Sequence, residues 1–149
     1  MKATRHRARL AGIMAAALLL AGCSGPASVA ERVERGLPTS LTEAQRSAVP
    51  WEQTSVLGLE DGSRFALITW GSSSCPTVVS TMEAVGTEGI EGIEGIELHL
   101  ESSGGSGPCT ADMAATTHEL SFPDSVTARP ITLTLVHAES DATSTLTLD

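Results

Sequence analysis

Three cysteines constrain this chain more than any other feature, because they follow an apparent export signal. Cys23 closes Leu20-Ala21-Gly22-Cys23, which is typical of a lipobox, the motif in which the cysteine is acylated. Acylation removes this thiol from pairing and leaves Cys75 and Cys109 in an oxidising compartment, where a disulfide is the usual outcome. The sequence therefore predicts one Cys75–Cys109 bridge. Two free thiols, or bridges between molecules, are the alternatives.

Residues 1–22 have the organisation of a lipoprotein signal peptide. A positively charged start is followed by an apolar segment from Leu10 to Ala21. This segment has about a dozen residues, fewer than the ~20 that a membrane-spanning helix needs. Cleavage before Cys23 would leave a mature protein held by acyl chains such as palmitate, and two or more chains anchor stably. We expect an exported protein at the outer face of the cytoplasmic membrane.

The mature chain is strongly acidic. The signal contains four of the nine basic residues and none of the 18 acidic ones, which leaves five arginines and a net charge of −13. Such a surface disfavours nucleic acid, whose phosphates need a basic face, and it disfavours direct contact with anionic lipid. The expected membrane contact is therefore the lipid on Cys23. The sequence does not identify a protein or small-molecule partner, and no motif in it implies a cofactor.

The chain divides into three parts, of which the signal peptide at residues 1–22 is the first. Residues 23–39 lack a sustained apolar period and are interpreted as a lipid-anchored tether. Residues 40–149 form a single β domain, which begins with a possible short helix over 41–48. Ser40-Leu41-Thr42-Glu43 has the form of a capping box for this helix, and Pro50 would end it.

Seven short apolar runs with turn signals between them follow Trp51, which favours an all-β, disulfide-stapled antiparallel sandwich or open barrel of about seven strands. Asp61-Gly62 lies between the first two runs and is a strong hairpin signal. Strict alternation predicts that Ile96, Leu98 and Leu100 face inward, as do Ile131, Leu133 and Leu135. The predicted pairs are Thr54–Leu59 with Arg64–Trp70, Val78–Val85 with Ile96–Glu101, and Thr116–Phe122 with Pro130–His137, with Ser144–Leu148 beside the last.

A Glu-Gly-Ile triplet recurs from Glu88 to Ile96. Carboxylates at every third position suggest calcium, but calcium loops need Asp or Asn ligands on a sharply turning backbone with a closing Glu. We interpret the repeat as an extension of a hairpin loop, since added loop length costs little.

Two histidines are weak metal candidates. If the runs 116–122 and 130–137 pair around their connection, His118 and His137 lie on neighbouring rungs. With Met82 or Met113 they could bind copper or zinc. No spacing motif supports a metal site, and histidines at strand ends are more often half-buried and hydrogen-bonded.

Serine chemistry has little support in the sequence. Ser72, Ser73 and Ser74 precede Cys75, but neither a Gly-x-Ser-x-Gly elbow nor a Ser-x-x-Lys motif occurs. Small hydroxyl residues suit a tight turn that leads into a bridged cysteine. A triad can also be assembled in space without a motif, so the histidines and nearby serines or acids remain an alternative site.

Distinctive segments surround the two cysteines that are predicted to pair. They are Trp70-Gly71-Ser72-Ser73-Ser74-Cys75-Pro76 and Cys109-Thr110-Ala111-Asp112, followed by Thr116-Thr117, Leu120 and Pro123. In these segments the chain resembles small uncharacterised secreted lipoproteins of high-GC Gram-positive bacteria. The resemblance implies the cysteine pairing and a surface location. It brings no established activity and no catalytic residue. The Glu-Gly-Ile triplets depart from the short connection of that group.

These observations favour a lipid-anchored, non-catalytic domain that acts in binding at the cell surface. The alternative is a hydrolase or a copper- or zinc-handling protein with a site around His118 and His137. A binding domain should have a concave pocket or an exposed apolar patch.

Overall fold

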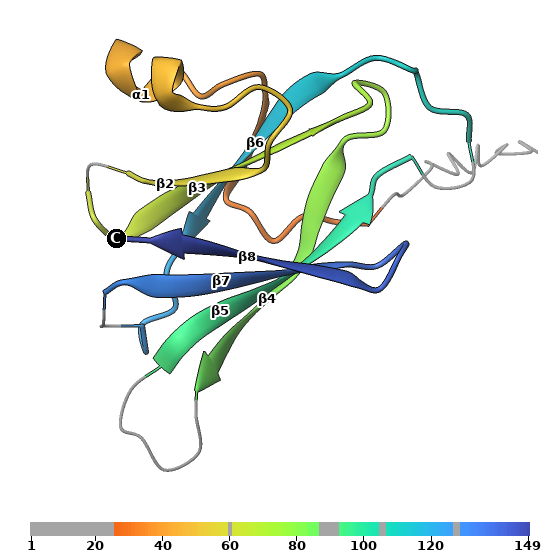
Figure 1. Ribbon diagram of the computed structural model, residues 1–149. Helices are drawn as coiled ribbons and strands as arrows, with labels where there is room; N and C mark the ends of the chain where they lie inside the picture. The colour runs from red at the N-terminus through yellow and green to blue at the C-terminus, as the bar shows by residue number, and fades with distance from the viewer. Residues whose placement is uncertain (1–25, 60, 87–92, 105–106, 127–128) are drawn as a thin grey trace, which may run out of the picture.

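The computed structural model describes residues 26–149 except 60, 87–92, 105–106 and 127–128 (Figure 1). The signal peptide and the acylation site predicted at Cys23 lie outside the described residues, as does the first part of the Glu-Gly-Ile repeat. No helix within the described ranges has the length and apolar character needed to cross a membrane.

In the described part of the chain, eight strands form two four-stranded sheets, which confirms the predicted all-β fold with its disulfide. The first sheet has the order β1-β6-β3-β2, with β1 at Arg32–Arg35, β6 at Ala114–Ser121, β3 at Arg64–Gly71 and β2 at Ser55–Gly58. The second has the order β4-β5-β7-β8, with β4 at Thr77–Gly86, β5 at Ile93–Ser102, β7 at Ile131–His137 and β8 at Ala142–Leu148. The element order also includes one short helix, α1, at Glu43–Ala48.

The main core lies between the two sheets. Alternate residues of each strand point into it because successive side chains of a strand face opposite ways. The six residues predicted to face inward on β5 and β7 are all buried there. The core also contains residues of the other strands, among them Phe65, Leu67, Val79, Leu120 and Leu148.

The outer face of the first sheet carries a second apolar cluster. Ile68 on β3 points to this face, because its neighbour Leu67 points into the main core. Ala115 on β6 lies opposite Trp70 and belongs to the same cluster. The segment that carries α1 lies over this face (Figure 1). It contributes the buried Leu41 and the partly buried Leu37 and Val49. Strands β3 and β6 are therefore buried on both faces.

Three of the predicted strand pairings are confirmed. The runs around Asp61-Gly62 form the β2–β3 hairpin. At its turn Gly62 has a φ of 68°, a conformation that glycine adopts readily. The second predicted pair corresponds to β4 and β5, and β8 returns beside β7.

The third predicted pair is wrong. The run 116–122 corresponds to β6, which pairs with β3 and β1, whereas the run 130–137 corresponds to β7 in the other sheet. There β7 lies parallel to β5. In the first sheet β6 is a central strand, and its residues from Ala115 to Leu120 are buried although four of them are polar. Adjacency in the sequence therefore does not decide this pairing.

The predicted tether also needs correction. Within residues 23–39 the structure contains β1, which pairs with β6 so that Val33 lies opposite His118. The Val29 amide donates to the Val79 carbonyl on β4 at 2.9 Å, so this segment contacts both sheets. Side chains of β1 are mostly exposed, which is why no apolar alternation revealed the strand.

The start of the helix differs from the predicted capping box. Thr42 is the N-cap residue, and its side chain and that of Gln45 cap each other's backbone amides. The box thus begins two residues after Ser40.

The disulfide joins two connections that pass between the sheets. Cys75 lies between β3 and β4, and Cys109 lies between β5 and β6, with their Cα atoms 5.5 Å apart. The predicted bridge is confirmed, and it holds the two crossings together.

Candidate functional site

An apolar cavity opens on the outer face of the first sheet, beside the C-terminal end of α1. Its volume is about 510 Å³. Two tryptophans line it, and we call it the tryptophan pocket. Its lining residues are Gly36, Leu37, Arg46, Val49, Trp51, Trp70, Met113, Ala114 and Ala115.

Local structure explains how the two rings meet. Trp70 ends the alternation of β3 and points outward, on the same face as Ile68. Trp51 follows Pro50 directly after α1. Their ring centroids lie 4.5 Å apart with the planes tilted by 57°, within the range of attractive aromatic pairs. These are the only two tryptophans of the chain.

The rim of the tryptophan pocket is exposed and apolar. Trp51 is 66 % exposed and Met113 is 47 % exposed. A single exposed apolar residue needs no explanation, but two large ones beside a cavity are typical of an interaction site.

Two polar groups of the tryptophan pocket are left unmatched. The Nε atom of Arg46 and the Nε1 atom of Trp70 are shielded from solvent and have no hydrogen-bond partner among the described residues. The Arg46 Nη2 atom donates to the Thr39 carbonyl at 3.0 Å. Within the described part of the chain, Arg46 forms no ion pair with a carboxylate. A buried donor without an acceptor costs about 1–3 kcal/mol.

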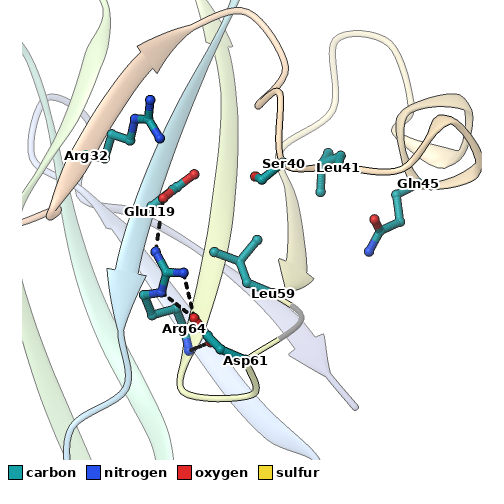
Figure 2. Close-up of a pocket in the computed structure, with 8 residues that line it drawn as sticks. All are labelled: Arg32, Ser40, Leu41, Gln45, Leu59, Asp61, Arg64 and Glu119. Atoms are coloured by element: carbon teal, nitrogen blue, oxygen red, sulfur yellow. Dashed lines mark hydrogen bonds and ion pairs between the residues drawn. The ribbon is translucent and has the colours of Figure 1, made fainter.

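A second cavity, the polar cleft, lies on the same face and has a volume of about 330 Å³ (Figure 2). Figure 2 shows Arg64 between two carboxylates, with ion-pair distances of 2.6 Å to Asp61 and 3.4 Å to Glu119. Hydrogen bonding to Arg64 lowers the pKa of Asp61, and the same contact raises the pKa of Arg64. This arginine is already neutralised, so the polar cleft is poorly suited to an anionic ligand. The cleft is lined by Arg32, Ser40, Leu41, Gln45, Leu59, Asp61, Arg64 and Glu119.

The serines before Cys75 are occupied in a turn. The Ser74 hydroxyl accepts from the Thr110 amide at 2.9 Å, and the Ser73 amide donates to Asp112 Oδ1 at 3.1 Å. Hydrogen bonds from Ser73 and then from Thr110 lower the pKa of Asp112 to about 2. Among the described residues, none of these serines is hydrogen-bonded to a histidine. The network links the two flanks of the disulfide, as a structural turn would.

The two candidate histidines lie in different sheets, so the pairing on which the metal hypothesis depends is wrong. His118 is fully buried, with its Nε2 atom 3.3 Å from the Thr69 hydroxyl. Burial lowers the pKa of His118 to about 4, and the backbone of Thr77 opposes this shift. The Nδ1 atom of His118 is shielded from solvent and has no hydrogen-bond partner within the described part of the chain.

His137 is half-buried and lines a cleft beside the disulfide. The two methionines considered as soft ligands are also apart: Met82 packs against the main core, and Met113 lines the tryptophan pocket. The described residues contain no group of three metal-ligating side chains.

Sequence reasoning missed the tryptophan pocket. Its one local signal is the presence of both tryptophans in a chain that is only 3 % aromatic. No protein-family model matches this sequence, and comparisons with curated proteins and with solved structures also found no match. The site is therefore interpreted from its own chemistry.

Proposed function

We propose that this protein is a non-catalytic binding domain, anchored by lipid on Cys23 at the outer face of the cytoplasmic membrane, and that the tryptophan pocket is its binding site. One observation carries the proposal: both tryptophans of the chain border the same apolar cavity, and one of them is 66 % exposed. The exposed part of this ring, beside the cavity, is apolar surface that a ligand could cover.

The size and lining of the pocket support a binding role. Small-molecule sites typically have volumes of about 300–1,000 Å³ and mostly apolar walls with a few polar groups. The tryptophan pocket falls in this range at about 510 Å³. Arg46 is the charged side chain in its lining that would orient a ligand.

The same lining supports a non-catalytic role. The residues of the tryptophan pocket include no serine, cysteine, histidine or carboxylate. Arg46 is the only ionisable residue there, and arginine stays protonated in proteins, so it cannot serve as a general acid or base. The pocket can bind and orient a molecule, but it offers no nucleophile to attack it.

The anchoring part of the proposal is supported by the lipobox Leu20-Ala21-Gly22-Cys23 and by the signal-like segment before it. Intact-mass analysis of the protein from its own host tests this part. A mature chain that begins at an acylated Cys23 is expected, and an unmodified amino terminus would contradict it.

Tryptophan fluorescence tests the pocket directly, because the chain has no tyrosine and both tryptophans border the cavity. We expect octanol to change the emission saturably in the wild-type protein. In Trp51→Ala the remaining Trp70 should report affinity weakened about tenfold or more, since much of the apolar contact is lost.

Val85→Ala is the matched control, because Val85 is also an exposed apolar residue but lies on β4 in the other sheet. It should bind octanol as the wild type does. A response that never saturates, or equal binding by Trp51→Ala, would rule out the tryptophan pocket as the site.

A further inference from the structure

We infer that the ligand of the tryptophan pocket is a small apolar carboxylate, with its anionic head on Arg46 and its apolar body against the tryptophans. This inference rests on the function proposed above and adds the chemical class of the ligand.

Arg46 lines the tryptophan pocket without a carboxylate partner among the described residues. The mature domain has five arginines and 18 acidic residues, so acidic partners are abundant. Arg32 forms an ion pair with Glu34 at 2.6 Å, and Arg64 contacts two carboxylates. Arg35, Arg46 and Arg129 form no ion pair with the described residues, and of these three it is Arg46 that lines the apolar cavity. An anion that enters the cavity would meet a cation that the protein itself has left unneutralised.

Among the described residues, the guanidinium group of Arg46 has one hydrogen bond, from Nη2 to the Thr39 carbonyl at 3.0 Å. The guanidinium group presents its donors as a planar fork that matches the two oxygens of a carboxylate. A carboxylate therefore fits this group better than a single hydroxyl or carbonyl oxygen does.

The remaining lining residues indicate that the body of the ligand is apolar. Apart from Arg46, the side chains that line the pocket are apolar, and the two rings are the largest surfaces. The volume of about 510 Å³ is that of a small-molecule site, which is why we assign a small ligand instead of a protein partner.

Octanoate and octanol form the test pair, because they share a chain length and differ in the head group. Both are titrated into the full chain carrying Cys23→Ser, so that no acyl chain of the protein competes, and tryptophan emission is followed. We expect octanoate to bind about tenfold tighter than octanol or more, as charge-assisted hydrogen bonds predict. In Arg46→Gln this preference should vanish, because the charged partner of the octanoate head group is removed.

Arg129→Gln is the matched control, since Arg129 stacks on Phe122 and does not line the pocket. It should keep the full preference for octanoate. Arg46→Lys should keep part of it, because the charge remains while the planar fork is lost.

The outcomes separate the two proposals. Equal affinities of the wild type for octanoate and octanol would overturn the carboxylate inference and leave the binding site in place. Saturable binding of neither compound would overturn both. A preference for octanoate that survives in a folded Arg46→Gln protein would place the anion elsewhere and also overturn the inference.

Discussion

At His118, burial and charge are in direct conflict. The side chain lies between the sheets and contacts Thr69. Burial lowers its pKa in the folded protein from the ordinary 6.5 to about 4. As the pH falls, the unfolded chain takes up this proton first, and the free energy of unfolding decreases with it. The stability linked to this group is complete above about pH 6.5 and is lost progressively down to about pH 4.

His118→Gln should therefore flatten the acid side of the stability profile. Glutamine keeps a hydrogen-bonding group near Thr69 but does not titrate, so the loss of stability between neutral pH and about pH 4 should shrink by up to ~3 kcal/mol. Urea unfolding at several pH values measures this difference. His137→Gln is the control, because His137 is only half-buried. Profiles of equal steepness in the wild type and His118→Gln would contradict the assignment.

At the scale of elements, the parallel contact between β5 and β7 organises the second sheet. In its register Gly95 lies opposite Thr132. A Cβ atom added at Gly95 would lie 2.8 Å from the Thr132 backbone oxygen, closer than side chains tolerate. The absence of a side chain at Gly95 thus permits the close approach of the two strands.

Gly95→Ala should lower the free energy of unfolding by about 1–3 kcal/mol, the usual cost of overpacking, because the obstructing atom is backbone. Gly71→Ala is the matched control on β3, where an added Cβ meets nothing within 4 Å, and its effect should be small. Both variants are compared by urea unfolding. Equal stabilities of the two would argue against the parallel register.

The edge strand β1 supports the tryptophan pocket. It pairs with β6, and the Gly36 carbonyl that follows it accepts from the Thr117 hydroxyl at 2.7 Å. Gly36 and Leu37 then line the tryptophan pocket. The chain therefore continues directly from β1 into one wall of the tryptophan pocket.

A chain that starts at Ser40 should be less stable than one that starts at Pro26 by several kcal/mol, at about 1 kcal/mol per lost hydrogen bond. Thermal unfolding of the two chains measures this. The shorter chain should also lose octanol binding, because one wall of the tryptophan pocket is gone. Equal midpoints would show that β1 contributes no stability.

At the scale of the whole molecule, the chain passes repeatedly between two sheets, and the disulfide joins two of the passages. The cysteines are separated by 34 residues, and the chain-entropy model assigns such a loop roughly 3–4 kcal/mol. A domain of this size has a typical stability of only about 5–15 kcal/mol. The bridge is therefore a large part of what keeps the sheets together.

Reduction should lower the free energy of unfolding by this amount, and the double variant Cys75→Ala, Cys109→Ala should match the reduced wild type. Urea unfolding with and without reductant measures both. The double variant should no longer respond to reductant. An unchanged midpoint after complete reduction would contradict the role of the bridge.

Local signals in the sequence were sufficient for the features that depend on neighbouring residues. Alternation identified the inward faces of β5 and β7, and the Asp61-Gly62 turn identified the β2–β3 hairpin, because each depends on a few consecutive residues. The number of cysteines, together with the expected export of the chain, predicts the Cys75–Cys109 bridge that the structure contains.

Tertiary structure alone decided the rest. Three strand pairings join segments that are far apart in the sequence, and no short segment contains the information that selects them. They are the pairings of β6 with β3, of β7 with β5 and of β1 with β6. The tryptophan pocket has the same origin, since Leu37, Trp51, Trp70 and Met113 meet only after the chain has folded over the outer face of the first sheet. Burial is a property of the assembled layers, so a site built from it becomes visible only when the layers are in place.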